Sequence, residues 1–356
     1  MTVTGNPYFK HLDGVRTIAV LMVVLHHWYE GPSPIHLGGS MGVGMFFVLS
    51  GFLITNILLR QQESFQSGIS GIRSRILRTF YIRRTIRIFP IYYLYVGCLL
   101  VFGIGYAREI WPWLLGYGYN FLLFFTNNWY SGYVEHLWSL AIEEQYYLIW
   151  PVLILSCPPK YNWHLVLGFI VIAMVTKAAL YLHAPATQFS KFPVCQFDAF
   201  GVGSALSLLW LKDKPIPYAA ALMWLFWIIT LSIKLQWIQF YGLSFLGQVI
   251  PFFSIGCAFF IYLAARGIRG IPGYFFENSF VSYLGKISYG IYLYHLFVPD
   301  FVKWSFRTNG MEIPSTEVLW IIYSALTLLI CSASWFLIEK PINLLKDRFA
   351  YKPARR

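Results

Sequence analysis

Apolar stretches long enough to cross a membrane recur along the whole 356-residue sequence. Hydrophobic residues make up 58% of the chain and charged residues only 12%, a balance that soluble domains rarely have. About 20 apolar residues let a helix span the hydrocarbon core. The sequence therefore predicts an all-α, polytopic membrane protein, with residues 1–356 as a single transmembrane domain and no separate soluble domain. Candidate spans lie near residues 15–30, 41–59, 88–105, 111–127, 137–156, 164–182, 194–211, 217–233, 245–265, 287–305 and 317–338.

The basic residues between these stretches predict which loops face the cytoplasm. Segment 60–87 holds seven arginines against one acid, which places it inside by the positive-inside rule. The other basic loops fall on that side only if residues 88–136 make an odd number of crossings. We therefore expect residues 111–127 to be re-entrant or interfacial, leaving about ten transmembrane helices around a central cavity, with both termini in the cytoplasm. The basic positions counted are Lys160, Lys212, Lys214, Arg266, Arg269, Lys286, Lys346, Arg348, Lys352, Arg355 and Arg356.

The net charge of +12 is gathered in these short loops, so we expect a lipid bilayer as the partner and no nucleic acid. The five cysteines are isolated in or beside apolar stretches, without a CxxC pair. No zinc-type spacing, Walker loop or HExxH sequence occurs. The sequence therefore predicts no metal site and gives no support to ATP-driven transport or to metal-dependent hydrolysis.

Arg16 and His27 share nearly one face of the first apolar stretch, because eleven residues at 100° each make about three full turns. They are about 16 Å apart along the helix, roughly half the hydrocarbon core. Asp13 precedes Arg16 by one turn, so an ion pair at the helix entrance is one explanation for both. A buried His27 is either a packing residue with a hydrogen-bond partner or a neutral imidazole that acts as a base.

The segment FYIRRTIRIFP places Arg84 and Arg87 on one helical face at the start of the third candidate span. A positive-inside anchor explains basic residues here. All basic residues between positions 60 and 87 are arginines and none is a lysine, which favours bidentate binding of phosphates. A membrane anchor and a phosphate site therefore both stay open as explanations.

Two further segments carry polar residues at helical spacing. HLWSLAIEEQYYLIWP puts His136, Ser139 and Glu143 on one face. ISYGIYLYHL puts Tyr292 and His295 on a polar and aromatic stripe, which either lines a cavity or packs between helices. Ser50-Gly51 in GMFFVLSGFLI predicts close helix packing, and the EKP sequence at 339–341 predicts the end of a helix.

With these motifs in their order and spacing, the chain resembles the acyltransferase 3 family of integral-membrane O-acyltransferases over nearly its whole length. HLDGVRTIAVLMVVLHH, GVGMFFVLSGFLIT, FYIRRTIRIFPIYY, HLWSLAIEEQYYLIWP and ISYGIYLYHL carry the resemblance. It implies that Arg16 and His27 are the functional Arg-x10-His pair, that Arg84 and Arg87 are the Arg-x-x-Arg element, and that Glu143 is the acid after WSL.

The resemblance implies transfer of an acyl group, expected to be acetyl, from cytoplasmic acyl-CoA to a hydroxyl of a carbohydrate or lipid-linked saccharide. His27 is then the general base or an acyl relay, with Arg16 and Glu143 as further catalytic residues. Arg84, Arg87 and the adjacent Arg83 form the expected acyl-CoA site, and His136, Ser139, Tyr292 and His295 line the acceptor cavity. Acyl-CoA is a co-substrate and no cofactor is permanently bound.

We expect the protein in a bacterial cytoplasmic membrane. The alternative from the residues alone is a transporter or flippase for a glycan-linked or anionic substrate, in which His27 and Glu143 relay protons and the arginines bind substrate. A membrane anchor or sensor is a third possibility, against which the intramembrane charges in three separate segments argue.

Overall fold

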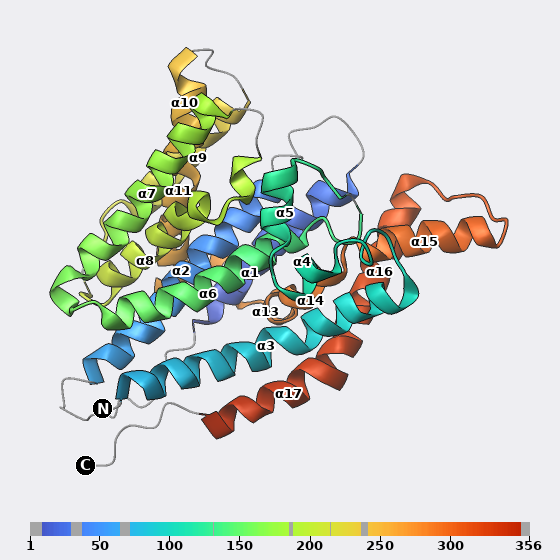
Figure 1. Cartoon of the computed structure of the whole chain (residues 1–356), viewed down its shortest axis with the longest axis horizontal. Coiled ribbons are helices and arrows are strands. Elements are labelled where there is room, and N and C mark those ends of the chain that lie inside the picture. Colours follow the sequence, from blue (N-terminus) through green and yellow to red (C-terminus); the bar gives the residue numbers. More distant parts are fainter. Residues whose placement is uncertain are drawn as a thin grey trace.

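The computed structural model describes residues 9–29, 38–64, 72–130, 132–184, 188–213, 215–235 and 241–349, and within these ranges its regular secondary structure is helical (Figure 1). The α-helices are α1 (Lys10–Trp28), α2 (Gly38–Ser64), α3 (Ile72–Phe102), α4 (Trp111–Leu115), α5 (Tyr119–Thr126), α6 (Leu137–Ser156), α7 (Asn162–His183), α8 (Phe197–Trp210), α9 (Ala219–Lys234), α10 (Tyr241–Val249), α11 (Phe252–Arg266), α12 (Ile271–Glu277), α13 (Ser279–Lys286), α14 (Ser288–Tyr294), α15 (Phe297–Thr308), α16 (Thr316–Ser334) and α17 (Lys340–Leu344). Shorter helical turns are η3 (Pro159–Tyr161), η4 (Phe189–Lys191), η5 (Pro193–Gln196), η6 (Trp335–Glu339) and η7 (Leu345–Phe349).

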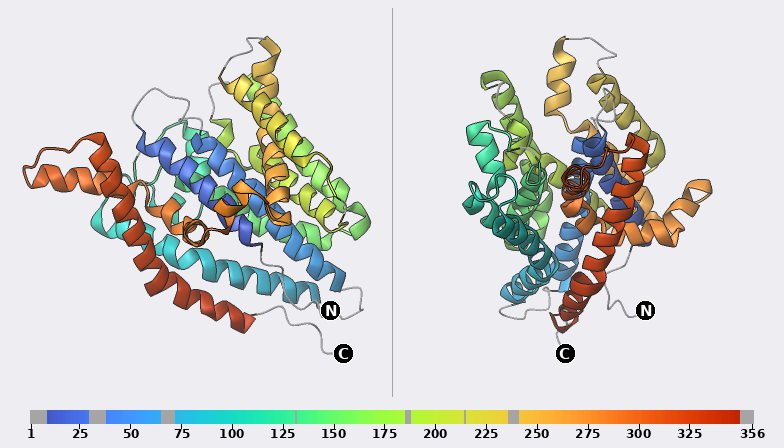
Figure 2. Two further views of the ribbon diagram at one scale, coloured as in Figure 1. Left: turned by 180° about the vertical axis from the view of Figure 1, so that it is seen from behind. Right: turned by 90° about the vertical axis from the view of Figure 1, so that its right-hand side faces the viewer.

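Helices α1, α2, α6 and α8 form the centre of the molecule. Helices α7, α9, α10 and α11 gather on one side of them, and α3 and the helices from α16 to η7 lie on the other (Figures 1 and 2). The all-α architecture that the sequence predicts is therefore present in the described residues. Helices from distant parts of the sequence meet at the centre, where the cavities described below lie.

The closest packing in this centre is between α2 and α8, at two glycines. A Cβ atom on Gly203 would lie 2.0 Å from the carbonyl oxygen of Val48, and one on Gly51 would lie 2.2 Å from that of Phe200. The two backbones are thus in direct contact, as small residues permit between membrane helices. The close packing predicted at Ser50-Gly51 is confirmed.

We expect Gly203→Ala to lower the thermal unfolding midpoint of the detergent-solubilised protein clearly, because a methyl group there overlaps the backbone of α2. Overpacking of this kind costs about 1–3 kcal/mol of unfolding free energy, or more when backbone must move. Gly97→Ala in α3 is the matched control, since a Cβ there would meet no atom within 4 Å. Equal midpoints for the two variants would contradict the close contact.

Polar side chains inside this apolar centre bond to one another across helices. The Thr55 hydroxyl of α2 lies 2.8 Å from the Ser204 hydroxyl of α8, and Trp150 of α6 donates its indole N–H to Thr55 at 2.8 Å. Ser207 donates to the carbonyl oxygen of Phe52 at 2.6 Å. These bonds satisfy groups that would be costly to leave unpaired in an apolar interior and fix the register of the three helices.

Within the described ranges, four helical runs are long and apolar enough to cross a membrane. A fifth crossing results if α11 and α12, which are bent by 79° relative to each other, count as one. Several long apolar helices therefore support an integral membrane protein. The four runs are Gly38–Gln62, Arg73–Phe102, Pro159–His183 and Thr316–Phe349.

Three of the expected spans are broken in the structure. Stretch 111–127 divides into α4 and α5, which fits the expectation that it is no ordinary spanning helix. Stretch 245–265 is interrupted before Pro251, because proline has no N–H to continue α10. The expectation of one helix over 287–305 is wrong, since the run divides into α14 and α15 at residues 295–296, where Pro299 has no N–H to donate to the His295 carbonyl.

Two other helices are longer than predicted. Helix α3 has 31 residues, roughly 46 Å, so the arginines before residue 88 belong to the same helix as the apolar part that follows. The helix stop expected at EKP is wrong, because α16 continues through the π-helical turn η6 into α17 and η7. Pro341, which has no N–H to donate, directly follows this π-helical turn, in which the Lys340 N–H donates to the Trp335 carbonyl oxygen.

The basic residues expected in the cytoplasm gather on one side. Lys212 lies over the Trp163 ring at 5.8 Å, and Arg266 pairs with Asp213 at 2.9 Å. These contacts bring together the ends of α8 and α11 and the start of α7. The end of α2, the start of α3 and the end of η7 also lie together (Figures 1 and 2). Lys214, Lys352, Arg355 and Arg356 lie outside the described residues.

Candidate functional site

Two adjoining cavities lie between the central helices and α3. The centre of a water-sized sphere can reach about 100 Å³ in the inner cavity and about 320 Å³ in the outer cavity, and both are partly open. They share Arg16, Leu53, Arg87 and Tyr289 in their walls. The inner cavity is also lined by Val43, Phe46, Phe47, Leu49, Ser50, Arg84, Ile88, Ser139, Leu140, Glu143, Glu144, Tyr147, Ser288 and Tyr292.

The outer cavity carries an excess of positive charge. Four cationic side chains and two carboxylates line it, together with apolar residues of α1, α2 and η6. Its charged residues belong to α1, to α3 and to the part of the chain after residue 285, so distant parts of the sequence meet there. The cations are Arg16, Arg87, Lys286 and Lys346, and the acids are Asp13 and Glu339.

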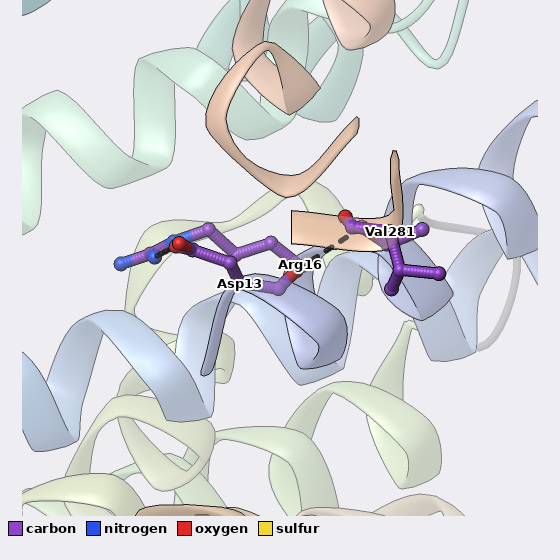
Figure 3. A network of polar contacts seen from close by, with 4 residues as sticks. Asp13, Arg16 and Val281 are labelled. Atoms are coloured by element: carbon purple, nitrogen blue, oxygen red, sulfur yellow. Dashed lines mark hydrogen bonds and ion pairs between the residues drawn. The ribbon is translucent and has the colours of Figure 1, made fainter. Parts of the chain in front are cut away.

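The first turns of α1 hold Arg16 at the junction of the two cavities. The Arg16 guanidinium donates to Asp13 Oδ1 at 2.6 Å, so the ion pair considered from the sequence is present (Figure 3). On another side of the helix, Thr17 donates to the backbone carbonyl of Val281 at 2.7 Å. A Cβ on Gly285 would lie 2.1 Å from the Asp13 carbonyl oxygen, so α13 packs directly on α1 and fixes the position of Arg16.

The arginines of α3 separate into two groups. Arg84 and Arg87 line the inner cavity, and Arg87 also lines the outer one. Arg84 lies over the Tyr147 ring, with its guanidinium carbon 4.9 Å from the ring centroid. Arg83, which we expected in the acyl-CoA site, lines neither cavity. It donates instead to the backbone carbonyls of Lys346 and Phe349, at 2.8 and 3.3 Å.

Glu143 accepts a hydrogen bond from the Ser50 hydroxyl at 2.7 Å, and that hydroxyl lies 3.0 Å from the Tyr147 hydroxyl. This triad of Ser50, Glu143 and Tyr147 joins α2 to α6 inside the inner cavity. The sequence indicated only packing at Ser50. The structure adds its hydroxyl to the polar site, a pairing of residues 93 positions apart that helical spacing cannot reveal.

The inner cavity is bounded on another side by Ser139 and Tyr292, whose hydroxyls lie 2.5 Å apart. Both hydroxyls also lie 3.1 Å from the backbone carbonyl of His136. The side chain of His136 is 1% exposed and lies behind this wall. Ser139 and Tyr292 therefore line the cavity as expected, whereas His136 does not.

His27 lies behind the same wall and is absent from the lining of both cavities. Its Nδ1 is 2.9 Å from the Val23 carbonyl oxygen and 3.1 Å from Nε2 of His295. The Nδ1 of His295 is in turn 2.6 Å from the Tyr292 carbonyl oxygen. No hydrogen bond joins His27 to Glu143 or Arg16 in the described parts of the chain, so the expectation that either of them orients the imidazole is not met.

These contacts define the proton positions of the two rings in their neutral forms. A carbonyl oxygen only accepts, so the Nδ1 atoms of His295 and His27 carry hydrogen. The His295 Nε2 then accepts, and His27 Nδ1–H is shared between it and Val23. The lone pair of His27 is left on Nε2, which is the arrangement that a general base needs.

His136, His295 and His27 form a row, with ring centroids 5.1 Å apart between the first two and 4.9 Å apart between the last two. They come from the starts or ends of three helices. Among the described residues, no group of three or more His, Cys, Asp or Glu side chains has an arrangement suited to a metal ion. Within the row, His27 and His295 are joined by a hydrogen bond and can take part in proton transfer beside the inner cavity.

Comparison with known proteins shows which family the chain resembles over nearly its whole length. The family model described as "Acyltransferase domain" (Acyl_transf_3) matches residues 9–338. The peptidoglycan O-acetyltransferase OatA of Listeria monocytogenes is 30% identical over 95% of this chain and 56% of its own length. YrhL of Bacillus subtilis, a candidate peptidoglycan O-acetyltransferase, is 28% identical over 94% of this chain and 55% of its own length.

A candidate O-acetyltransferase of Staphylococcus aureus is 28% identical over 97% of this chain and 60% of its own length. The chain thus spans little more than half the length of these relatives. No solved structure matches it. Because the family model covers nearly all of the described residues, the chain belongs to the acyltransferase 3 family of acyltransferase domains.

Proposed function

We propose that this protein is a membrane O-acetyltransferase that moves an acetyl group from cytoplasmic acetyl-CoA to a hydroxyl of a carbohydrate or lipid-linked saccharide. The observation that carries the proposal is the pair of adjoining cavities. A cationic outer cavity suits the phosphates of CoA, and an inner cavity lined by hydroxyls and Glu143 leads from it toward the histidine row. The names of the relatives support acetyl as the group and a saccharide as the acceptor.

The donor binds from the cytoplasmic side in this proposal. Arg84 and Arg87 bind CoA phosphates, and the flexible pantetheine arm extends past Arg16 into the inner cavity. The thioester then lies near Ser139 and Tyr292. Tyr292 and His295 separate this position from His27, so the proposal requires that the Tyr292 side chain moves aside during the reaction.

His27 is the proposed general base. Its Nε2 removes the proton of the acceptor hydroxyl while the oxygen attacks the thioester carbonyl, and the C–S bond breaks to release CoA as the thiol. Glu143 and Arg16 stabilise charge in the inner cavity. In an acyl-histidine variant, Nε2 itself attacks the carbonyl and the acceptor hydroxyl then takes the acetyl group from the imidazole.

We also propose that the chain crosses a bacterial cytoplasmic membrane ten times as one transmembrane domain, with both termini in the cytoplasm and residues 111–127 not crossing. The clustering of basic loop ends on one side of the molecule supports this topology. The outer cavity lies near these ends, since Lys286 and Lys346 line it. Cytoplasmic acetyl-CoA would then have direct access to it.

The test of the proposed function is thiol release from acetyl-CoA by the purified protein with a panel of acceptors. The panel contains a soluble peptidoglycan fragment, a lipid-linked saccharide and a neutral oligosaccharide. We expect thiol release that depends on one of the saccharides. A protein that binds a saccharide tightly but releases no thiol with any acceptor would favour the transporter alternative.

The hydrogen bond from His27 to His295 leads to a prediction about a positioning residue. We expect His295→Leu to lower kcat roughly 10- to 100-fold with little change in KM for acetyl-CoA, because His27 loses one of the two acceptors that hold its Nδ1–H and orient its ring. His295→Gln offers an amide oxygen and is expected to recover part of kcat. A purely structural role would instead lower the amount of folded protein and leave the two variants alike.

A further inference from the structure

The last described segment of the chain closes one side of the outer cavity. The family model ends at residue 338, whereas Glu339, Asn343 and Lys346 of the following helical turns line the cavity. The segment comprises α17 and η7, and we call it the C-terminal segment (residues 340–349). It continues directly from α16 through the π-helical turn η6, an irregularity that is frequent at functional sites.

Arg83 attaches this segment to α3. Its guanidinium donates to the backbone carbonyls of Lys346 at 2.8 Å and Phe349 at 3.3 Å. The Lys346 ammonium donates to the Asn343 side-chain oxygen. Helices α17 and η7 also both contact α3. The segment is therefore held with Lys346 beside the cavity, on the side of the arginine-rich part of α3.

The cations around this cavity are only partly neutralised. Asp13 is paired with Arg16 at 2.6 Å, and Glu339 accepts from the Ser334 hydroxyl at 3.2 Å. Arg87 and Lys286 make no hydrogen bond or ion pair with any residue that the structure describes, although both are exposed to the cavity. Such a set of cations, drawn from α3, α13 and η7, is suited to an anion with several phosphates.

We infer that the C-terminal segment forms part of the donor site and places Lys346 to bind a phosphate of the nucleotide portion of acyl-CoA, with Arg83 as the residue that positions it. This inference rests on the proposed function. It assigns Arg83 a different task from Arg84 and Arg87. The latter two bind phosphate directly, whereas Arg83 acts through the backbone of η7.

Calorimetric titration of the full-length, detergent-solubilised protein with CoA and with pantetheine tests this assignment without knowledge of the acceptor. Pantetheine has the thiol arm but lacks the nucleotide phosphates. We expect Lys346→Ala to weaken CoA binding about tenfold and to change pantetheine binding less than about twofold. Arg348→Ala is the matched control, because Arg348 is exposed two residues further along and lines neither cavity.

Arg83 is tested by a double-mutant cycle with the same titration. If Arg83 acts by placing Lys346, then Arg83→Ala weakens CoA binding by a similar factor and the double variant is no weaker than either single variant. Arg83→Ala should also leave pantetheine binding unchanged. Additive losses in the double variant would show that Arg83 contributes in another way and would overturn its positioning role.

The remaining outcomes separate this inference from the proposed function. Unchanged CoA binding in Lys346→Ala overturns the inference, and it is the result expected if the cavity takes an anionic lipid headgroup. Equal loss of CoA and pantetheine binding also overturns it, because it indicates general damage to the cavity. If the unsubstituted protein binds no CoA, the proposed function fails as well. If Arg84→Ala weakens CoA binding but Lys346→Ala does not, the inference fails and the proposed function stands.

Discussion

Replacement of His27 by alanine is expected to lower kcat for acetyl transfer about 10²- to 10⁴-fold, the usual contribution of a general base. KM for acetyl-CoA should change little, because His27 lines neither cavity. His27→Gln keeps a polar group of similar size and should be nearly as inactive, since an amide cannot take up the proton. Steady-state kinetics with the active acceptor measure both parameters.

The matched control is His26→Ala. His26 is the neighbour of His27 in the sequence and lies about 100° away from it around α1. The two rings are edge to face, with their centroids 4.7 Å apart. If damage to the packing of α1 caused the loss of activity, kcat would fall in both variants. If the loss of the base causes it, kcat falls only in His27→Ala. Full activity of His27→Ala would exclude both the general-base and the acyl-histidine mechanism.

The second large effect is expected at Arg87, which lies at the junction of the two cavities. Arg87→Ala should raise KM for acetyl-CoA about 10- to 100-fold and change kcat less, because the lost contact is made to the phosphates in both the bound and the reacting state. Arg87→Lys keeps the charge but not the bidentate geometry, so we expect an intermediate KM.

Arg75→Ala is the control for Arg87, since Arg75 is an exposed arginine of the same helix that lines neither cavity. If Arg87 serves only as a positive-inside anchor, the two alanine variants should have the same KM for acetyl-CoA. That outcome would remove the phosphate-binding role from α3 while leaving the topology unaffected.

Much of the fold could be predicted because apolar length and basic loops are local properties of the sequence. The breaks within residues 245–265 and 287–305 were not predicted, since both stretches have enough apolar residues for one helix. Pro251 gives a local reason for the first break. Pro299 gives one for the second break, since it has no N–H to donate to the His295 carbonyl four residues earlier. At residues 295–296 the chain is fixed by contacts with distant parts, including the His295 ring to His27 and its carbonyl to Trp28.

The candidate site was predictable only where its residues share one helix. Helical spacing placed Ser139 and Glu143 on one face, and both line the inner cavity. The same rule does not exclude Arg83, because Arg83 lies about 100° from Arg84 around the helix but only about 40° from Arg87. Its bonds to the backbone of η7 are visible only in the folded chain. The pairs Ser50–Glu143 and His27–His295 join residues 93 and 268 positions apart, and only the folded chain reveals them.

The position of Lys346 beside the outer cavity could not be predicted from the sequence either. In the sequence it is one basic residue of a cytoplasmic tail, and tails of this kind are commonly solvated. Its place beside the outer cavity depends on the continuous helix from α16 to η7 and on the anchoring by Arg83. Because we predicted that the helix ends at EKP, we did not expect this continuous helix.

The central claim is that acetyl leaves CoA and becomes an ester on a saccharide through His27. The most direct measurement follows labelled acetyl-CoA in proteoliposomes and compares free thiol formed with labelled ester on the acceptor, for the unsubstituted protein and for His27→Ala. The account predicts equal amounts of thiol and ester for the unsubstituted protein and neither product for the variant. Labelled ester formed at the same rate by His27→Ala, or thiol formed without any ester, would contradict it.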